Sequence, residues 1–157
     1  MEEEGPGAVI FRGRYRFNGG AFRPSLTAYV MSTADRWVKH SFLLDTGADA
    51  TFLPRSSLAM LGIETVGVTV RDDVNGVGGQ DVPYIEHFGQ LRLISSEGAR
   101  IFEGTFNIFL DPHATEVPLL GRDVLDRFTC IFDRGKGQVM LLDPPDQYEL
   151  VRGEASS

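Results

Sequence analysis

The sequence has little of several features that mark common classes of protein. Its one cysteine, Cys130, leaves no internal disulfide, which argues against a disulfide-stapled secreted scaffold. There are 15 basic residues against 22 acidic ones, a formal charge of −7, which argues against nucleic acid as the main partner. No apolar run approaches the roughly 20 residues of a membrane-spanning helix, and the acidic start of the chain is not typical of a signal peptide. We therefore expect a soluble, cytoplasmic protein with no membrane or nucleic-acid partner.

What the sequence does contain fits one folded domain. It has 157 residues, of which 42% are hydrophobic and 24% charged, enough apolar side chains for a packed core. No internal repeat, low-complexity tract or linker divides it. We expect flexible tails at 1–7 and 149–157 and a single domain over 8–148.

Short apolar runs alternate with turn residues along the whole chain, a rhythm that is typical of a mainly β protein. The pattern predicts two short helices, at 54–61, where a proline opens the segment and Gly62 follows it, and at 123–128. The predicted strands are 26–31, 37–44, 66–70, 85–94, 101–110, 130–132 and 139–142. Two brief helices among many strands indicate a closed or folded-over β domain.

The segment with the clearest chemistry is 42–51, where an apolar run leads directly into Asp45-Thr46-Gly47. The run should place Asp45 at the end of a strand, where desolvation can raise the pKa of a carboxyl. Gly47 allows a tight turn and a close approach of backbone to the carboxylate. The Thr46 hydroxyl can bond to neighbouring backbone and hold the loop.

Two further motifs follow downstream. Segment 117–123 combines apolar residues with Gly121 and a charged residue that opens a helix. Between the two motifs, 75–79 is a glycine-rich turn with an apolar tip at Val77, which suits a mobile loop over a cleft. No Gly-Lys-Ser/Thr follows, and aspartates flank the turn, so a phosphate-binding loop is excluded.

These three elements, in this order, resemble the retropepsins, the retroviral-type aspartic proteases. The resemblance covers roughly 24–133 and is carried by 44–49 with Thr51, by 76–79 and by 119–122, and it continues more weakly through 129–132. Asp-Thr-Gly alone is a weak signal, whereas the ordered combination makes coincidence improbable. Extra residues at both ends of the resembling region, and a longer interval before the glycine-rich turn, make the chain more similar to the cellular members of the family than to the viral ones.

The resemblance implies a mainly β, single-domain closed barrel of the acid protease fold, with one or two short helices. It implies an aspartic endopeptidase that acts as a homodimer on peptide or protein substrates and needs no cofactor or metal. Asp45 of each subunit would be catalytic. Thr46, Gly47 and Arg122 would support the active-site loop, with Arg122 paired to Asp49. The residues implied in substrate binding are Gly47, Ala48, Asp49, Val77, Gly78 and Gly79, the last three in a flap.

Two other functions stay open from the sequence. One is a catalytically silent dimer of the same fold that serves as a binding or assembly module, which would have no need to keep Asp45, Thr46, Gly47 and Arg122. The other is a different hydrolase, such as a glycosidase that takes two carboxylates from one chain. Full activity of a monomer would favour the glycosidase.

The remaining chemically capable residues are better explained as structural. His40, His87 and His113 lack metal-ligand spacing, and Cys130 lies in an apolar run, as a buried thiol would. Asp111, Asp123 and Asp126 match no calcium-loop spacing, so we interpret them as solvated charges. The alternation of arginine and aromatic residues over 11–17 could contact RNA, but it equally describes a strand with one apolar and one charged face, and we expect such a strand as a guarded edge.

Overall fold

The computed structural model describes residues 8–75 and 81–144. These residues form strands joined mostly by short turns, with two helices of about one turn, α1 (Ser57–Leu61) and α2 (Arg122–Leu125). The strands are β1 (Val9–Asn18), β2 (Ala21–Met31), β3 (Trp37–Leu44), β4 (Phe52–Leu53), β5 (Arg71–Asn75), β6 (Asp81–Ile94), β7 (Ala99–Phe109), β8 (Leu119–Leu120), β9 (Thr129–Asp133) and β10 (Gln138–Asp143). The mainly β prediction is confirmed. Among these residues, no helix is long and apolar enough to cross a membrane.

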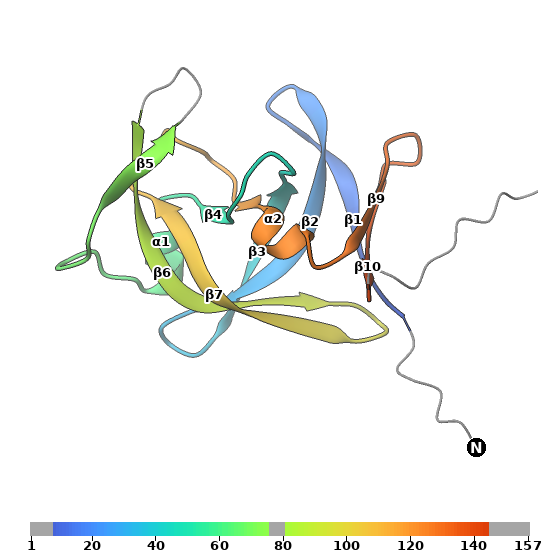
Figure 1. The fold of residues 1–157 in the computed structure, drawn as a ribbon, viewed down its shortest axis with the longest axis horizontal. Coiled ribbons are helices and arrows are strands. Elements are labelled where there is room, and N and C mark those ends of the chain that lie inside the picture. The colour runs from blue at the N-terminus through green and yellow to red at the C-terminus, as the bar shows by residue number, and fades with distance from the viewer. Residues whose placement is uncertain (1–7, 76–80, 145–157) are drawn as a thin grey trace, which may run out of the picture.

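The strands form one sheet that closes on itself over part of its length (Figure 1). Its strand order is β5-β6-β7-β4-β8-β3-β2-β1-β10-β9, and an additional pairing joins β6 to β2. That pairing is short, with Tyr29 opposite Arg92 and Val30 opposite Leu91. It completes a ring through β2, β3, β8, β4, β7 and β6, while β1, β10 and β9 continue beyond the ring as an outer flank.

Side-chain alternation directs the apolar residues of the ring strands into one core. Along β2, Leu26, Ala28 and Val30 are buried and alternate with more exposed neighbours. Along β3, Phe42 and Leu44 are buried in the same way, which brings the apolar face of this strand up to the residue before Asp45. The strand that leads into the candidate site is therefore anchored by the core itself.

β1 passes from one neighbour to another. Its first half pairs with β10 and its second half with β2, and Arg14 pairs with both. Gly13 lies where the change occurs, and a Cβ added there would lie 2.1 Å from the carbonyl oxygen of Ser25. The strand predicted at 11–17 is confirmed. Its interpretation as an edge is only partly right, because β1 lies between β2 and β10 in the strand order, while its residues beyond Tyr15 pair with β2 alone in the described ladder.

Most predicted elements are found with shifted ends. The helix expected at 54–61 begins three residues later, because Pro54 to Ser57 form a turn in which Ser57 N–H donates to Pro54 O at 2.9 Å. It ends, as expected, at Gly62, which is left-handed (φ 69°). The second helix covers only the start of 123–128, and Phe128 continues it as a turn through a bond to Leu125 O.

The strand predicted at 66–70 is wrong. These residues form a turn and an extended loop, in which Gly67 has a left-handed φ of 77° and Val68 N–H donates to Thr65 O at 3.3 Å. Val66 is 91% exposed. Alternating valines predict a strand only if another strand lies beside them, and β5, which begins at Arg71, is the segment that pairs.

Candidate active site

The backbone joins the Asp45 motif directly to the 117–123 motif. The end of β3 runs parallel to β8, with Leu43 opposite Leu119 and Leu44 opposite Leu120. The backbone N–H of Asp45 extends the ladder by donating to Leu120 O at 3.0 Å. Two motifs separated by about 70 residues in sequence therefore form one site.

A tight turn follows Asp45 and holds its carboxylate. Asp45 Oδ1 accepts a hydrogen bond from the Gly47 N–H at 3.0 Å, and the Asp45 carbonyl accepts one from the Ala48 N–H at 3.2 Å. Asp45 is half-buried, whereas Thr46 and Gly47 are exposed. The loop thus fixes the carboxylate of Asp45 while leaving the surface around it open to a ligand or a second chain.

Close contact between the two motifs explains the glycine at 121. A Cβ at this position would lie 2.3 Å from Ala50 O and 2.9 Å from Ala48 O. Directly after Gly121, the Arg122 N–H donates to Ala48 O at 2.8 Å and the Asp123 N–H donates to Asp49 O at 3.2 Å. The start of α2 is therefore attached to the loop through its backbone, independently of any side-chain charge.

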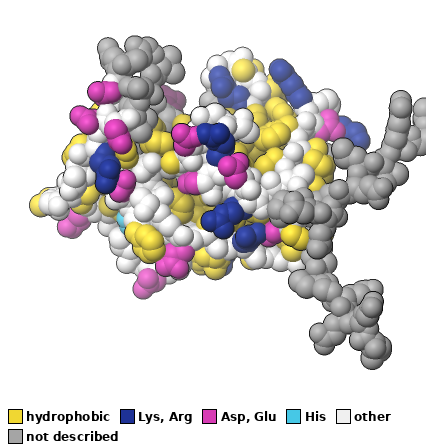
Figure 2. Space-filling view, viewed as in Figure 1, with side chains coloured by type: hydrophobic (Ala, Val, Ile, Leu, Met, Phe, Trp, Pro, Cys, Tyr) yellow, Lys and Arg dark blue, Asp and Glu magenta, His cyan; other side chains and the backbone are white. Residues whose placement is uncertain are grey.

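The side chains of Asp49 and Arg122 also meet, as an ion pair between Asp49 Oδ1 and Arg122 Nη2. Both are well exposed, at 84% and 49% of their side-chain surfaces. Exposed pairs of this kind contribute at most about 1 kcal/mol to stability. Figure 2 shows acidic side chains close to a basic one near the middle of this face of the molecule.

The structure joins two residues of this site, Thr51 and Asp123, that the sequence analysis did not connect. Asp123 is bonded through both carboxylate oxygens: Oδ2 accepts from the Thr51 N–H at 2.9 Å, and Oδ1 from the Thr51 hydroxyl at 2.8 Å. The fully buried Thr51 hydroxyl in turn accepts from the Gly121 N–H at 3.2 Å. Asp123 is exposed, in agreement with the prediction of a solvated charge, and its carboxylate in addition holds Thr51 in place. Both residues lie within the two motifs, Thr51 in 42–51 and Asp123 in 117–123, and this is the hint of their contact that the sequence contains.

The other predicted substrate-binding residues, Val77, Gly78 and Gly79, lie outside the described residues. The strands on either side of them, β5 and β6, pair antiparallel, with Asn75 opposite Asp81. Nearer the barrel, the Tyr84 hydroxyl donates to Asp73 Oδ1. This hydrogen bond is the main cause, and desolvation the second cause, that raises the pKa of Tyr84 to about 12. The same bond holds the pKa of Asp73 below its usual range. The bond thus holds β5 to β6, which is one of the strands of the ring.

The structural interpretations of histidine and cysteine fit their surroundings. His40 is buried beside α1, with Nδ1 3.0 Å from Val38 O and Nε2 3.2 Å from Ser57 Oγ, and burial lowers its pKa. Cys130 is half-buried, its Sγ lies 3.6 Å from Leu125 O, and burial raises its thiol pKa. Over 8–75 and 81–144, no three side chains of the metal-ligating types cluster closely enough to hold an ion.

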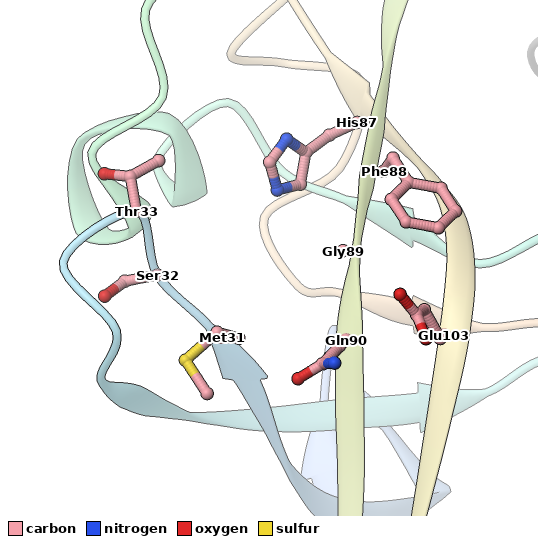
Figure 3. Close-up of a pocket in the computed structure, with 8 residues that line it drawn as sticks. All are labelled: Met31, Ser32, Thr33, His87, Phe88, Gly89, Gln90 and Glu103. Carbon is pink, nitrogen blue, oxygen red and sulfur yellow. The ribbon is translucent and has the colours of Figure 1, made fainter.

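One pocket lies away from these motifs. It has a volume of about 260 Å³ and is lined by residues of β6, of β7, of the end of β2 and of the β2–β3 turn. These residues are Met31, Ser32, Thr33, His87, Phe88, Gly89, Gln90 and Glu103 (Figure 3). Met31 pairs with Trp37 at the start of β3, the end opposite to Asp45. The pocket contains none of the predicted site residues.

Comparison with known proteins agrees with this geometry. A family model described as aspartyl protease matches residues 31–124, which include both motifs. Among solved structures, the fold is similar to that of a retropepsin-like aspartic protease from Rickettsia conorii, with a TM-score of 0.62 and 17% identity over 90% of this chain and 97% of that chain. EIAV protease complexed with the inhibitor HBY-793 matches with a TM-score of 0.44 and 21% identity, over 71% of this chain and 91% of that chain. No curated protein matches significantly.

The predicted fold class is therefore confirmed as retropepsin-like and mainly β. The family model covers more than half of the chain, and it contains the loop that holds Asp45 and the segment packed against that loop. The chain belongs to the aspartyl protease family.

Proposed function

We propose that this protein is an aspartic endopeptidase whose active site forms between two copies of the chain, each contributing Asp45. The observation that carries the proposal is the loop at the end of β3, in which Asp45 is fixed by Gly47 and by the β8 ladder yet remains half-exposed. The chain has a single Asp-Thr-Gly segment, at 45–47, so a second carboxylate of the same kind must come from another copy.

In this mechanism, the two Asp45 carboxyls lie close together and share one proton, because two adjacent carboxylates cannot both ionise without repulsion. The ionised member takes a proton from a water lying between them, and that water attacks the peptide carbonyl carbon. The protonated member donates to the carbonyl oxygen, and the tetrahedral intermediate collapses after proton transfer to the leaving amine. The working pH should be acidic to mildly acidic.

The surrounding residues would hold this arrangement. Thr46, exposed next to Asp45, would bond to the second copy, while Gly47, Ala48 and Asp49 would contact the substrate backbone. The Arg122–Asp49 pair would keep the substrate-binding part of the loop in place. Val77, Gly78 and Gly79 would cover the bound peptide and exclude water.

The test is digestion of a proteome-derived peptide library between pH 3 and pH 7, with wild type and Asp45→Asn side by side. We expect wild type to cleave internal peptide bonds and Asp45→Asn to lose at least about 1,000-fold of the rate while keeping the fold. Because each copy contributes Asp45, the substitution replaces both members of the dyad and removes both the base and the shared proton, which are each worth about 100-fold or more.

Three outcomes would overturn parts of the proposal. Cleavage by Asp45→Asn at the wild-type rate would reject Asp45. A wild type that neither cleaves peptides nor is stabilised by a statine-type inhibitor would indicate a silent binding module, since a transition-state mimic stabilises only a formed dyad. Full activity in a monomer would favour a hydrolase that uses two carboxylates of one chain.

A further inference from the structure

The β1–β2 hairpin extends past residues 45–51, which the proposed function makes the catalytic loop. β2 pairs with β3 only from Ser25, opposite Leu43, onward, so 21–23 reach beyond the end of β3 at Leu44. Counting along the neighbouring strands places Arg23 level with Asp45, and the turn at Gly19–Gly20 lies roughly 10 Å farther out at about 3.3 Å per residue. We call residues 16–23 the hairpin arm; Figure 1 shows it projecting beyond the barrel.

The arm is held by few contacts of its own. Tyr15 N–H still donates to Gly137 O at 2.9 Å, but beyond it the described ladder contains only β1–β2 pairs, from Arg16–Arg23 to Asn18–Ala21. A two-stranded ribbon is only marginally stable in water by itself. A feature of this kind suits a surface that is completed by contact with another molecule.

One face of the arm carries two exposed aromatic rings. Phe17 is 68% exposed and Phe22 is 59% exposed, and they form a cross-strand, edge-to-face pair with centroids 5.5 Å apart. They continue the face that is buried farther along β2 at Leu26, so the inner face of the sheet simply runs on past the end of the core. Phe22 also lines a cleft of about 320 Å³, together with Tyr15 and the β9–β10 turn.

The arm is also basic, although the whole chain is acidic. Arg16 and Arg23 are directly opposite each other, a like-charge pair that costs stability in an isolated sheet. Neither has an acidic partner within 4 Å in the described part of the chain. Figure 2 shows basic side chains around hydrophobic ones over this hairpin and the neighbouring β9–β10 turn. The catalytic loop nearby carries the acidic residues Asp45 and Asp49, so the arm and the loop carry charges of opposite sign.

We propose that the hairpin arm is a docking arm that packs its Phe17–Phe22 face against the second copy of the chain in the active dimer. The inference rests on the proposed function, because that function decides where the second copy lies. Two Asp45 carboxyls that share one water must approach to within a few ångströms. The arm continues the strand that pairs with β3 and reaches roughly 10 Å past the level of Asp45, so a second copy that brings its own Asp45 to this point would lie against the arm.

The chemistry of the arm fits that occupant. A second copy offers a chain of formal charge −7, with the exposed Asp49 in its loop, to a basic arm, and a twofold axis would form each such contact twice. Contact with the partner would remove the two phenylalanine rings from water and would relieve the Arg16–Arg23 repulsion. The arm would therefore make the catalytic dimer more stable without taking part in the chemistry.

The test compares Phe17→Thr/Phe22→Thr with Phe88→Thr in the full chain. Phe88 is a matched control, because it is also 68% exposed but lies on β6, away from the arm. Threonine keeps strand propensity in all cases. Sedimentation over a range of protein concentrations gives the dimer Kd, and peptide cleavage is measured over the same range.

We expect the double variant to raise the dimer Kd by roughly 100-fold or more, because each buried phenylalanine is worth a tenfold change or greater. Its cleavage should be lost at low enzyme concentration and return at high concentration, whereas Phe88→Thr behaves as wild type. Hydrogen exchange should show amides of the arm protected in the wild-type dimer and not in the monomer, which tests the contact without any mutation.

A wild-type Kd in the double variant, an equal loss in Phe88→Thr, or a wild type that stays monomeric would each overturn the docking arm. A wild-type dimer that is weakened by the double variant but cleaves nothing would support the arm and reject the protease mechanism. An active monomer would reject both.

Discussion

Two regions at the same end of the molecule differ in how their polar and apolar groups are satisfied. In the catalytic loop, 45–51, backbone and side-chain polar groups bond to the 117–123 segment or to the loop itself. In the hairpin arm, the rings of Phe17 and Phe22 remain mostly in water, and Arg16 and Arg23 have no acidic partner within 4 Å among the residues that the structure describes. The polar groups that shape the first region are bonded within one chain, whereas the second leaves an apolar face uncovered by the described residues. Preorganised polar groups suit chemistry, and an uncovered apolar face suits contact.

The largest effect should follow from breaking the loop where backbone meets backbone. Gly121→Ala places a Cβ 2.3 Å from Ala50 O and forces the two motifs apart. We expect a loss of about 3 kcal/mol in the free energy of unfolding, measured in urea, together with loss of peptide cleavage. Gly104→Ala is the control, because nothing lies within 4 Å of a Cβ there. Equal stability of the two variants would mean that the loop is looser than its contacts imply.

A smaller effect should follow from removing one hydroxyl from the same region. Thr51→Val keeps the shape but deletes the bonds that join Thr51 Oγ1 to Asp123 and to Gly121. Since a buried partner is left unsatisfied, we expect a loss of about 1–3 kcal/mol in urea unfolding and a lower kcat at unchanged fold. Thr105→Val, at an exposed position of β7, should change stability by less than about 0.5 kcal/mol. A loss of similar size in both variants would contradict the stabilising role of the Thr51–Asp123 hydrogen bonds.

Acid should weaken the contact of β3 with α1 that His40 makes through Ser57, and it should leave the arm unchanged. Burial holds the pKa of His40 below its usual 6.5, so the unfolded chain takes up the proton first as the pH falls. The stability from neutral His40 is therefore complete above about pH 6.5 and is lost as the pH drops toward its folded pKa, at a slope of at most about 1.4 kcal/mol per pH unit. Thermal unfolding between pH 7 and pH 4 should show a flatter dependence in His40→Gln than in wild type. His113→Gln, at an exposed position, is the control and should keep the wild-type slope.

The smallest effect is expected for the arm in the monomer. Phe17→Thr/Phe22→Thr removes rings that are already mostly exposed, so the free energy of unfolding of the monomer should change by less than about 1 kcal/mol. Urea unfolding at a concentration where wild type is monomeric measures this. A loss as large as that of Gly121→Ala would show that the arm is part of the core, and the contrast with the catalytic loop would fail.

Much of the fold and of the site follows from local patterns. Period-two burial is readable in 26–31 and 37–44, and both strands are found there, because alternation acts within a single strand. The Asp-Thr-Gly turn is equally local: its Gly47–Asp45 bond spans two residues. The 66–70 segment failed for the complementary reason, since its alternating valines had no neighbouring strand to pair with.

The mainly β class, the strand that leads to Asp45 and the two motifs around it are therefore readable from local patterns alone. Which further contacts complete the site, and which side chains stay exposed, depends on how distant segments pack together. Asp123 could be recognised as a partner of Thr51 only once β3 and β8 lay side by side, because the two residues are 72 positions apart in the chain. The arginine–aromatic alternation at 11–17 likewise predicts a strand. It does not predict that the end of the β1–β2 hairpin extends past β3 and leaves Phe17 exposed to water. Period and turn chemistry act over a few residues, whereas strand order and register are set by how distant segments share one core.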